Sequence, residues 1–176
     1  MTESETRAGF VAVIGAPNAG KSTLVNALVG QKVAIVSPKA QTTRARLMGI
    51  AIDGQAQILL VDTPGIFEPR RRLDRAMVAA AWTGAQDADL ILLVIDAAAG
   101  VNAEAERIIA SLGERQHPLF LTLNKIDLVK KSDLLALSAD LTERLNPEKV
   151  FMISASRGDG VADLKQALAT AMPEGP

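Results

Sequence analysis

Residues 10–22 read FVAVIGAPNAGKS, in which an apolar run leads directly into the pattern G-x-x-x-x-G-K-[ST]. The run Phe10–Ile14 predicts a buried strand, and the residues from Lys21 onward have the spacing of an amphipathic helix. A glycine-rich turn between a strand and a helix can wrap a phosphate with its N–H groups, and the helix start adds positive potential. We therefore expect a phosphate site made of Gly15, Ala16, Pro17, Asn18, Ala19, Gly20, Lys21, Ser22 and Thr23.

A second motif, DTPG at residues 62–65, follows the next strongly apolar run. Within the phosphate site, Lys21 supplies a point charge for the β- and γ-phosphates, and the Ser22 hydroxyl can reach a magnesium ion. An acidic residue at a strand end, here Asp62, can reach the same magnesium through water, and the Gly65 N–H can approach a γ-phosphate because no side chain blocks it. This strand end adds Asp62, Thr63, Pro64 and Gly65 to the expected site.

A third motif, NKID at residues 124–127, distinguishes between nucleotide bases. We expect the Asp127 carboxylate to be partly buried and to accept both N1–H and N2–H of guanine, whereas adenine lacks these donors. Asn124 can bond the other base edge and tie its loop to the phosphate loop, and the Lys125 stem can cover the ring face. Ser154 and Ala155, at the end of the last strand, are expected to aim backbone N–H groups at the guanine O6.

The composition describes one soluble globular domain of 176 residues, with 48% apolar residues and 19 basic against 20 acidic side chains. The absence of cysteine excludes a disulfide scaffold, thiolate zinc, iron–sulfur clusters and thiol catalysis, and it favours the cytoplasm. The net charge of −1 argues against a strongly basic nucleic-acid-binding domain. We expect no signal peptide and no membrane span, while peripheral association with the inner membrane stays open.

Short apolar runs alternate with helical patterns along the chain, which is typical of α/β folds. We expect strands at Phe10–Ile14, Leu47–Asp53, Ala56–Asp62, Leu90–Asp96, Leu119–Asn124 and Lys149–Ser154, and helices at Lys21–Val29, Arg72–Gly84, Ala103–Arg115, Ser132–Arg144 and Val161–Ala171. Asp53-Gly54-Gln55 is a hairpin signal. The prediction is a P-loop α/β domain: a mostly parallel six-stranded sheet with one antiparallel edge pair and helices on both faces.

These motifs, in this order, resemble the translation-factor-related P-loop GTPases. The segment Val33–Arg44 (VAIVSPKAQTTR), with GAPNAGKS and VDTPGI, narrows the resemblance to the Era-like GTPases. The resemblance implies a G domain that hydrolyses GTP to GDP and phosphate with magnesium. It makes Gln41–Ala45 the switch I motif, in which Thr43 or Thr42 closes on magnesium, and Pro64–Arg71 switch II.

The resemblance also implies a role beyond nucleotide binding. Era-like proteins assist assembly of the small (30S) ribosomal subunit and maturation of 16S rRNA, which they bind through a C-terminal KH domain. The expected layout is an extended or disordered segment at residues 1–8, a GTP-binding G domain at residues 9–172, and the start of a linker at residues 173–176. Because this chain has no KH domain, binding to rRNA and to the 30S subunit is implied for the full-length protein alone. The G domain itself is expected to be monomeric.

The resemblance assigns catalysis to Lys21, Thr43, Gly65 and Asn18. Where small G proteins carry a glutamine that orients the attacking water, this sequence has Ile66-Phe67, and an apolar side chain cannot polarise water. We therefore expect slow intrinsic hydrolysis. Several Era-like GTPases use the asparagine that matches Asn18 to hold potassium, which implies stimulation by that ion. The alternative is that Asn18 stabilises its own turn.

Three other readings stay open. Another Era-like GTPase, from tRNA modification or with tandem G domains, would share the phosphate loop and DTPG. A metabolic P-loop kinase is disfavoured by NKID, and a structural domain that retains its nucleotide would carry the same motifs. The arginines at 70–72 and Arg75 form either a surface for RNA or a partner, or a solvated helix start. Asp87, Asp89 and Asp96 are interpreted as residues of helix-to-strand connections and strand ends, and not as a second metal site.

Overall fold

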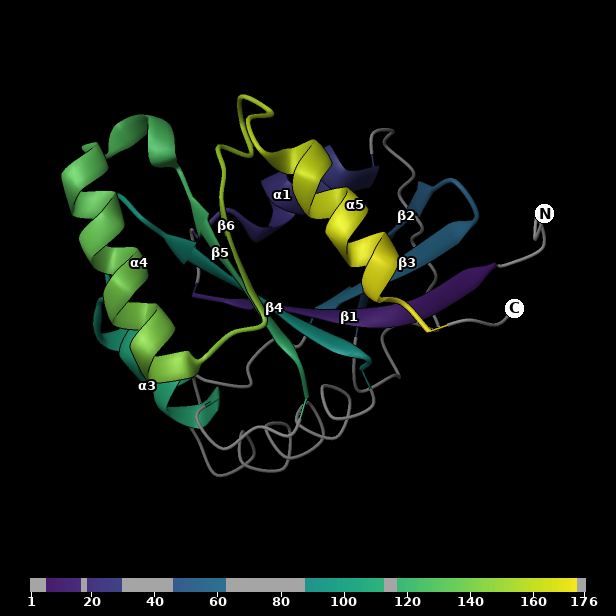
Figure 1. The fold of residues 1–176 in the computed structure, drawn as a ribbon, viewed down its shortest axis with the longest axis horizontal. Helices are drawn as coiled ribbons and strands as arrows, with labels where there is room; N and C mark the ends of the chain where they lie inside the picture. Colours follow the sequence, from purple (N-terminus) through teal and green to yellow (C-terminus); the bar gives the residue numbers. More distant parts are fainter. Residues whose placement is uncertain (1–5, 17–18, 30–45, 63–87, 113–116, 174–176) are drawn as a thin grey trace.

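The computed structural model describes residues 6–16, 19–29, 46–62, 88–112 and 117–173, which form a central sheet covered by helices (Figure 1). The strands are β1 (Arg7–Gly15), β2 (Arg46–Asp53), β3 (Ala56–Asp62), β4 (Leu90–Asp96), β5 (Leu119–Asn124) and β6 (Lys149–Met152). The helices are α1 (Lys21–Val29), α3 (Ala103–Leu112), η2 (Ile126–Leu128, a 3-10 turn), α4 (Lys131–Leu145) and α5 (Val161–Ala171). Among these residues, no helix is long and apolar enough to cross a membrane.

The six strands form one sheet in the order β2-β3-β1-β4-β5-β6. β2 and β3 pair antiparallel at the edge, and each of the other neighbouring pairs is parallel. The hairpin between β2 and β3 turns at Gly54, whose φ of 61° suits glycine. The predicted fold class is confirmed. In a parallel arrangement of this kind the carboxyl ends of β1, β3, β4, β5 and β6 meet at one edge, where the loops with the sequence motifs gather.

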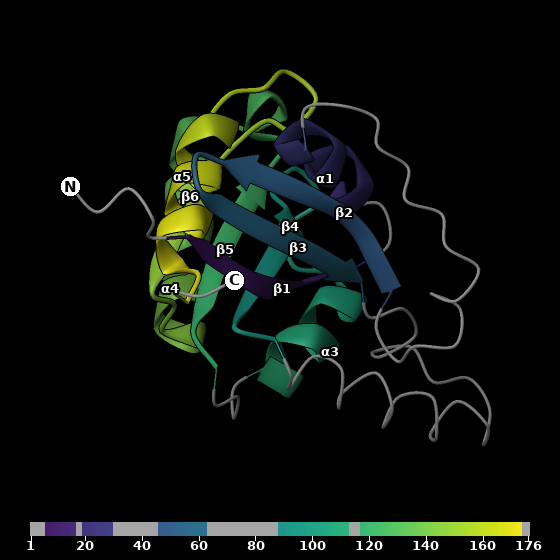
Figure 2. The same ribbon diagram turned by 90° about the vertical axis from the view of Figure 1, so that its right-hand side faces the viewer.

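The sheet separates two apolar cores, because successive residues of a strand point to opposite faces. One core lies against α3 and α4 and contains Ile91, Leu93 and Ile95 of β4. The other lies against α1 and α5 and contains Leu90, Leu92 and Val94 of the same strand. Figure 2 shows α1 and α5 on one side of the sheet and α3 on the other. The continuously apolar run of β4 is thus explained by burial on both faces.

Several element bounds differ from the predicted ones. β1 begins at Arg7 instead of Phe10, because residues 7–9 pair with residues 56–58 of β3 although they are not an apolar run. β6 ends at Met152 instead of Ser154, since the Ser154 N–H donates to the carbonyl of Asp159 in an isolated bridge. α4 extends one residue beyond the expected helix at each end. The expected helix at residues 72–84 and the end of the helix expected at residues 103–115 lie outside the described residues.

The amino end of β1 holds the end of α5 (Figure 1). The Ala8 N–H donates to the carbonyl of Pro173 at 3.1 Å, and the Arg7 guanidinium donates to the carbonyl of Met172 at 2.7 Å. Asp89 pairs with Phe10 twice: its N–H donates to the Phe10 carbonyl at 2.8 Å, and its carboxylate accepts the Phe10 N–H at 2.9 Å. We call this set of contacts the amino-end clasp.

Candidate functional site

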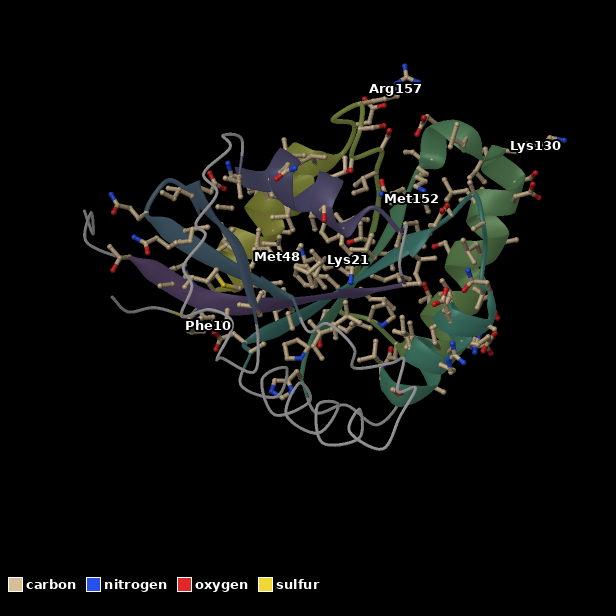
Figure 3. All side chains as sticks on the ribbon, turned by 180° about the vertical axis from the view of Figure 1, so that it is seen from behind. Phe10, Lys21, Met48, Lys130, Met152 and Arg157 are labelled. Atoms are coloured by element: carbon tan, nitrogen blue, oxygen red, sulfur yellow. The ribbon has the colours of Figure 1, made fainter. Side chains whose placement is uncertain are left out.

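The phosphate loop leaves β1 at Gly15 and enters α1 at Lys21. A Cβ on Gly15 would lie 2.7 Å from the carbonyl oxygen of Val94, and the Lys21 stem is next to it at 3.4 Å. Gly20 has a φ of 99°, and a Cβ there would collide with the side-chain nitrogen of Asn124. Both glycines of the predicted loop are therefore required by close approach, and Gly20 also by its backbone conformation. Figure 3 shows Lys21 near the centre of the molecule, whereas Lys130 and Arg157 point outward from the rim.

Asn124 joins three loops at the carboxyl edge of the sheet. Its Nδ2 donates to the carbonyl of Ala19 in the phosphate loop at 3.0 Å, and its Oδ1 accepts the N–H of Ala155 at 3.0 Å. Its backbone carbonyl accepts the N–H of Ala97, just after β4, at 2.9 Å. Asn124 is 2% exposed, so these bonds are made in a dry environment where an unpaired group is costly. The predicted tie between the NKID loop and the phosphate loop is present in the structure.

The orientation of the Asn124 amide follows from its partners. A carbonyl can only accept and a backbone N–H can only donate, so the NH2 group must face Ala19 and the oxygen must face Ala155. Exchanging the two amide atoms would place like groups together at both ends. Asparagine has the length needed here and carries both a donor and an acceptor, which explains why this position requires an amide.

Lys125 and Asp96 form an ion pair beside Asn124. The Lys125 Nζ lies 2.9 Å from Asp96 Oδ2, and the other carboxylate oxygen accepts the N–H groups of Ala98 and Ala99. Burial raises the pKa of Asp96, but the hydrogen bonds from Lys125, Ala99 and Ala98 and the lysine charge outweigh it, so the pKa lies below its usual value. Lys125 has a φ of 68°, in the left-handed region. No local pattern in the sequence indicates this pair, and Asp96 is a functional candidate that the motifs do not include.

The backbone N–H groups of Ser154 and Ala155 have partners within the protein. The N–H of Ser154 donates to the carbonyl of Asp159 at 3.0 Å, and that of Ala155 donates to Asn124 Oδ1. The loop after β6 thus closes on itself and on Asn124, and the contact of these N–H groups with guanine O6 stays a prediction. Among the described residues, the buried hydroxyls of Ser154 and of Thr122 on β5 have no hydrogen-bond partner.

Asp127 differs from its expected setting. It lies in the turn η2 and is exposed, where the sequence predicted a partly buried carboxylate. None of the described residues donates a hydrogen bond to this carboxylate. An exposed acceptor at the rim, next to the Asn124 bridge, remains suited to a base that offers two donors.

The expected magnesium ligands are placed in part. Ser22 and Thr23 are exposed in the first turn of α1, and Asp62 ends β3, where its backbone is in register with Val13 of β1. Ser22 thus lies in the helix that follows β1, and Asp62 ends the strand that pairs with β1. Among the described residues, no three Asp, Glu, His or Cys side chains form a group that could hold a metal ion. Pro17, Asn18, Thr42, Thr43, Thr63, Pro64 and Gly65 lie outside the described residues.

A cavity of about 300 Å³ flanks the phosphate loop on the side of α3. It is lined by Ala16 and Ala19 of the loop, by Asp96 at the end of β4, and by Asn102 and Glu104 at the start of α3. Asn102 caps this helix by accepting the N–H of Ala105 at 2.9 Å. The remaining lining on the side of α3 is the small side chain of Ala105.

Comparison with known proteins agrees with this geometry. The model of the 50S ribosome-binding GTPase family matches residues 10–125. The GTPase Era of Afipia carboxidovorans is 62% identical over 171 residues, which are 97% of this chain and 56% of that protein. A crystal structure of Era with MgGDPNP and nucleotides 1506–1542 of 16S ribosomal RNA is 37% identical with a TM-score of 0.79, covering 97% of this chain and 59% of that one.

An Aquifex aeolicus Era variant bound to GDP.AlF4- is equally similar, at 37% identity and a TM-score of 0.78, over 97% of this chain and 59% of that one. The chain thus spans little more than half the length of the curated relatives it matches. The matched family region begins within β1 and includes the phosphate loop, β2 to β5 and the first two residues of NKID.

Proposed function

This chain belongs to the family of 50S ribosome-binding GTPases, and on that premise we propose that it is a guanine-nucleotide switch that hydrolyses GTP to GDP and phosphate. The bridge made by Asn124 is the observation that carries the proposal. One buried residue holds three segments in a fixed relation: its side chain bonds the phosphate loop and the loop after β6, and its backbone carbonyl bonds the residue after β4. A nucleotide needs that relation, because its phosphates and its base must be bound at the same time.

The described residues fit a nucleotide with magnesium. The phosphate loop has the close backbone approach that a phosphate cradle requires, at Gly15 and Gly20. Lys21 lies at the start of α1, where a positive charge and the helix dipole act together on an anion. We propose that Ser22 and Asp62 hold magnesium, which supplies positive charge to the β- and γ-phosphates when bound. Thr43 is proposed as the further ligand, with Thr42 as the alternative.

Guanine selectivity is assigned to Asp127 and Asn124. The exposed carboxylate of Asp127 accepts two N–H groups of guanine and none of adenine. Since the N–H of Ala155 is engaged by Asn124 Oδ1, contact with O6 requires Asn124 to release that bond. The selectivity thus rests first on Asp127.

Competition binding tests this assignment. We expect GTP and GDP to displace a fluorescent GDP from the chain, and ATP to fail at a thousandfold excess. Asp127→Asn should lose guanine and gain affinity for xanthine nucleotides, because the amide now offers a donor to the base. Equal displacement by ATP would favour the metabolic kinase, and binding without single-turnover hydrolysis would favour the structural domain.

The role of potassium is a finer proposal. Because Ile66 and Phe67 cannot orient water, we propose that Asn18 holds a potassium ion that supplies the missing positive charge. Hydrolysis should then be faster in potassium than in sodium at fixed magnesium, and Asn18→Ala should remove the difference. Equal rates in the two salts would contradict the proposal.

For the longer protein we propose the role that the related proteins' names suggest, in assembly of the small ribosomal subunit, with 16S rRNA as partner. The crystal structure of Era with 16S rRNA nucleotides supports this, as does the identity of 62% to a protein named GTPase Era. A cytoplasmic location is proposed on the same ground, because ribosomal RNA is the proposed partner. Peripheral contact with the inner membrane is a separate proposal that these comparisons do not address. The test is co-sedimentation of the endogenous full-length protein with small-subunit precursors, and its recovery in ribosomal fractions of a different size would favour the other Era-like readings.

A further inference from the structure

Asp96 joins two loops of the candidate site with one carboxylate. Oδ1 accepts the N–H groups of Ala98 and Ala99 at 2.9 and 3.0 Å, which fixes the turn between β4 and α3. Oδ2 accepts Lys125 Nζ at 2.9 Å. Because the turn holds Oδ1, the orientation of the carboxylate is fixed, and Oδ2 points toward Lys125. Asp96 is thus a fixed anchor and not a second flexible partner.

Lys125 is held at both ends. Its backbone is left-handed, with φ 68° and ψ 36°, and its carbonyl accepts the N–H of Leu128 in η2 at 3.0 Å. A residue with a Cβ adopts this conformation at a cost, so its surroundings must stabilise it. Its side chain crosses from the end of β5 to the end of β4, where Asp96 and Asn124 are in register. The lysine stem therefore runs along the rim of the site.

The pair also lies along the phosphate loop. Asp96 lines the same cavity as Ala16 and Ala19, and the neighbouring Asn124 bonds the carbonyl of Ala19. Two consecutive residues of the NKID motif thus contact two different elements, one the phosphate loop and the other the end of β4. Movement of the Lys125 side chain would therefore change the surface between the proposed base site and the phosphate loop.

Resting on the proposed function, we propose that Asp96 is a positioning residue for guanine-nucleotide binding, which presets the Lys125 stem for contact with the bound nucleotide. Lysine has a long flexible side chain, and ordering it on binding lowers affinity. With Asp96 in place, this ordering has occurred before the nucleotide arrives. The effect should appear in the dissociation rate, since a preset contact must break before release.

A double-mutant cycle on GDP dissociation tests the proposal. Fluorescent GDP is chased with unlabelled GDP from the 176-residue chain and from the Asp96→Asn, Lys125→Met and double variants. Asparagine retains an oxygen for the N–H groups of Ala98 and Ala99, so the turn is kept while the charge that holds Lys125 is lost. We expect Asp96→Asn to speed release about tenfold in the parent chain and to have no further effect beside Lys125→Met.

Additive effects in the two backgrounds would overturn the proposal, because they would mean that Asp96 acts through its turn. If Asp96→Asn does not fold, Asp96→Ser serves the same cycle, since its hydroxyl still accepts a turn N–H. Glu106→Gln is the matched control: it removes a carboxylate from the Arg144 pair that joins α3 and α4, and should leave the rate unchanged. Failure of the unmodified chain to bind GDP overturns the proposed function together with this inference, whereas additivity overturns the inference alone.

Discussion

At the carboxyl edge of the sheet, loops are joined by Asn124, which is 2% exposed, whereas in the amino-end clasp the Asp89 side chain and its bond to Phe10 are exposed. In both regions, a side chain forms a hydrogen bond with a backbone group of a distant segment and so joins two parts of the chain. Burial makes the difference between them. A lost bond at the clasp can be replaced by water, but a lost bond at Asn124 leaves dry, unpaired groups. We therefore expect the carboxyl edge, which carries the proposed nucleotide site, to tolerate substitution less well than the amino end.

The largest effect is expected from Gly20→Ala. The new Cβ would collide with Asn124 and place alanine at a φ of 99°, so the Asn124 bridge must break in addition to the backbone strain. We expect loss of GDP binding and a fall in Tm of more than about 10 °C. Gly158→Ala is the matched control, since it has a φ of 86° and nothing within 4 Å, and it isolates strain from collision. Similar falls for the two variants would contradict the role given to the collision.

Asn124→Ala should come next. It leaves the carbonyl of Ala19 and the N–H of Ala155 without partners in a buried setting, which costs roughly 2–5 kcal/mol of unfolding free energy. We expect GDP affinity to fall by at least about a hundredfold, measured by fluorescence titration alongside chemical denaturation. Asn26→Ala, at an exposed position of α1, provides the control. Wild-type affinity in Asn124→Ala would remove the central support of the proposed function.

Gly9→Ala probes the other end of β1. Its Cβ would lie 2.7 Å from the Asp89 carboxylate, 2.8 Å from Met172 Sδ and 2.9 Å from Pro173 Cδ. Overpacking of this kind costs about 1–3 kcal/mol, so thermal unfolding should shift downward by several degrees. GDP dissociation should stay unchanged. A change in the nucleotide rate would show that the two ends of β1 are coupled, contrary to the comparison.

The smallest effect is expected from Asp89→Ala. It removes one exposed hydrogen bond, to the Phe10 N–H, and keeps the backbone bond from the Asp89 N–H to the Phe10 carbonyl. The expected cost is about 0.5–1.5 kcal/mol of unfolding free energy, with no change in nucleotide binding. Urea denaturation provides the measurement. A loss as large as that of Asn124→Ala would mean that exposure does not distinguish the two regions.

Sequence patterns predicted those parts of the fold that depend on local chemistry. The apolar run at residues 119–124 gave the bounds of β5, and the Asp53-Gly54-Gln55 signal located the hairpin. The patterns did not predict the bounds of strands that depend on a partner distant in sequence. Residues 7–9 are a strand because β3 lies beside them, and β6 ends early because the N–H of Ser154 has a partner in Asp159.

The site divides in the same way. The motif NKID indicated that Asn124 would reach the phosphate loop, because an amide can donate and accept at once. Asp96 left no such signal, since its partner Lys125 is 29 residues away and an aspartate at a strand end is common in any α/β protein. Its role depends on the register of β4 and β5, which the folded sheet alone reveals.

The amino-end clasp has a geometric consequence for anything attached after Pro173. Strand β1 connects two points: the phosphate loop begins at Gly15, at its carboxyl end, and Ala8, near its amino end, bonds Pro173. Seven steps of about 3.3 Å separate the two, or roughly 23 Å. A domain attached after Pro173 in a longer relative would therefore start at the amino end of β1, whereas the phosphate loop lies at the carboxyl end of the same strand.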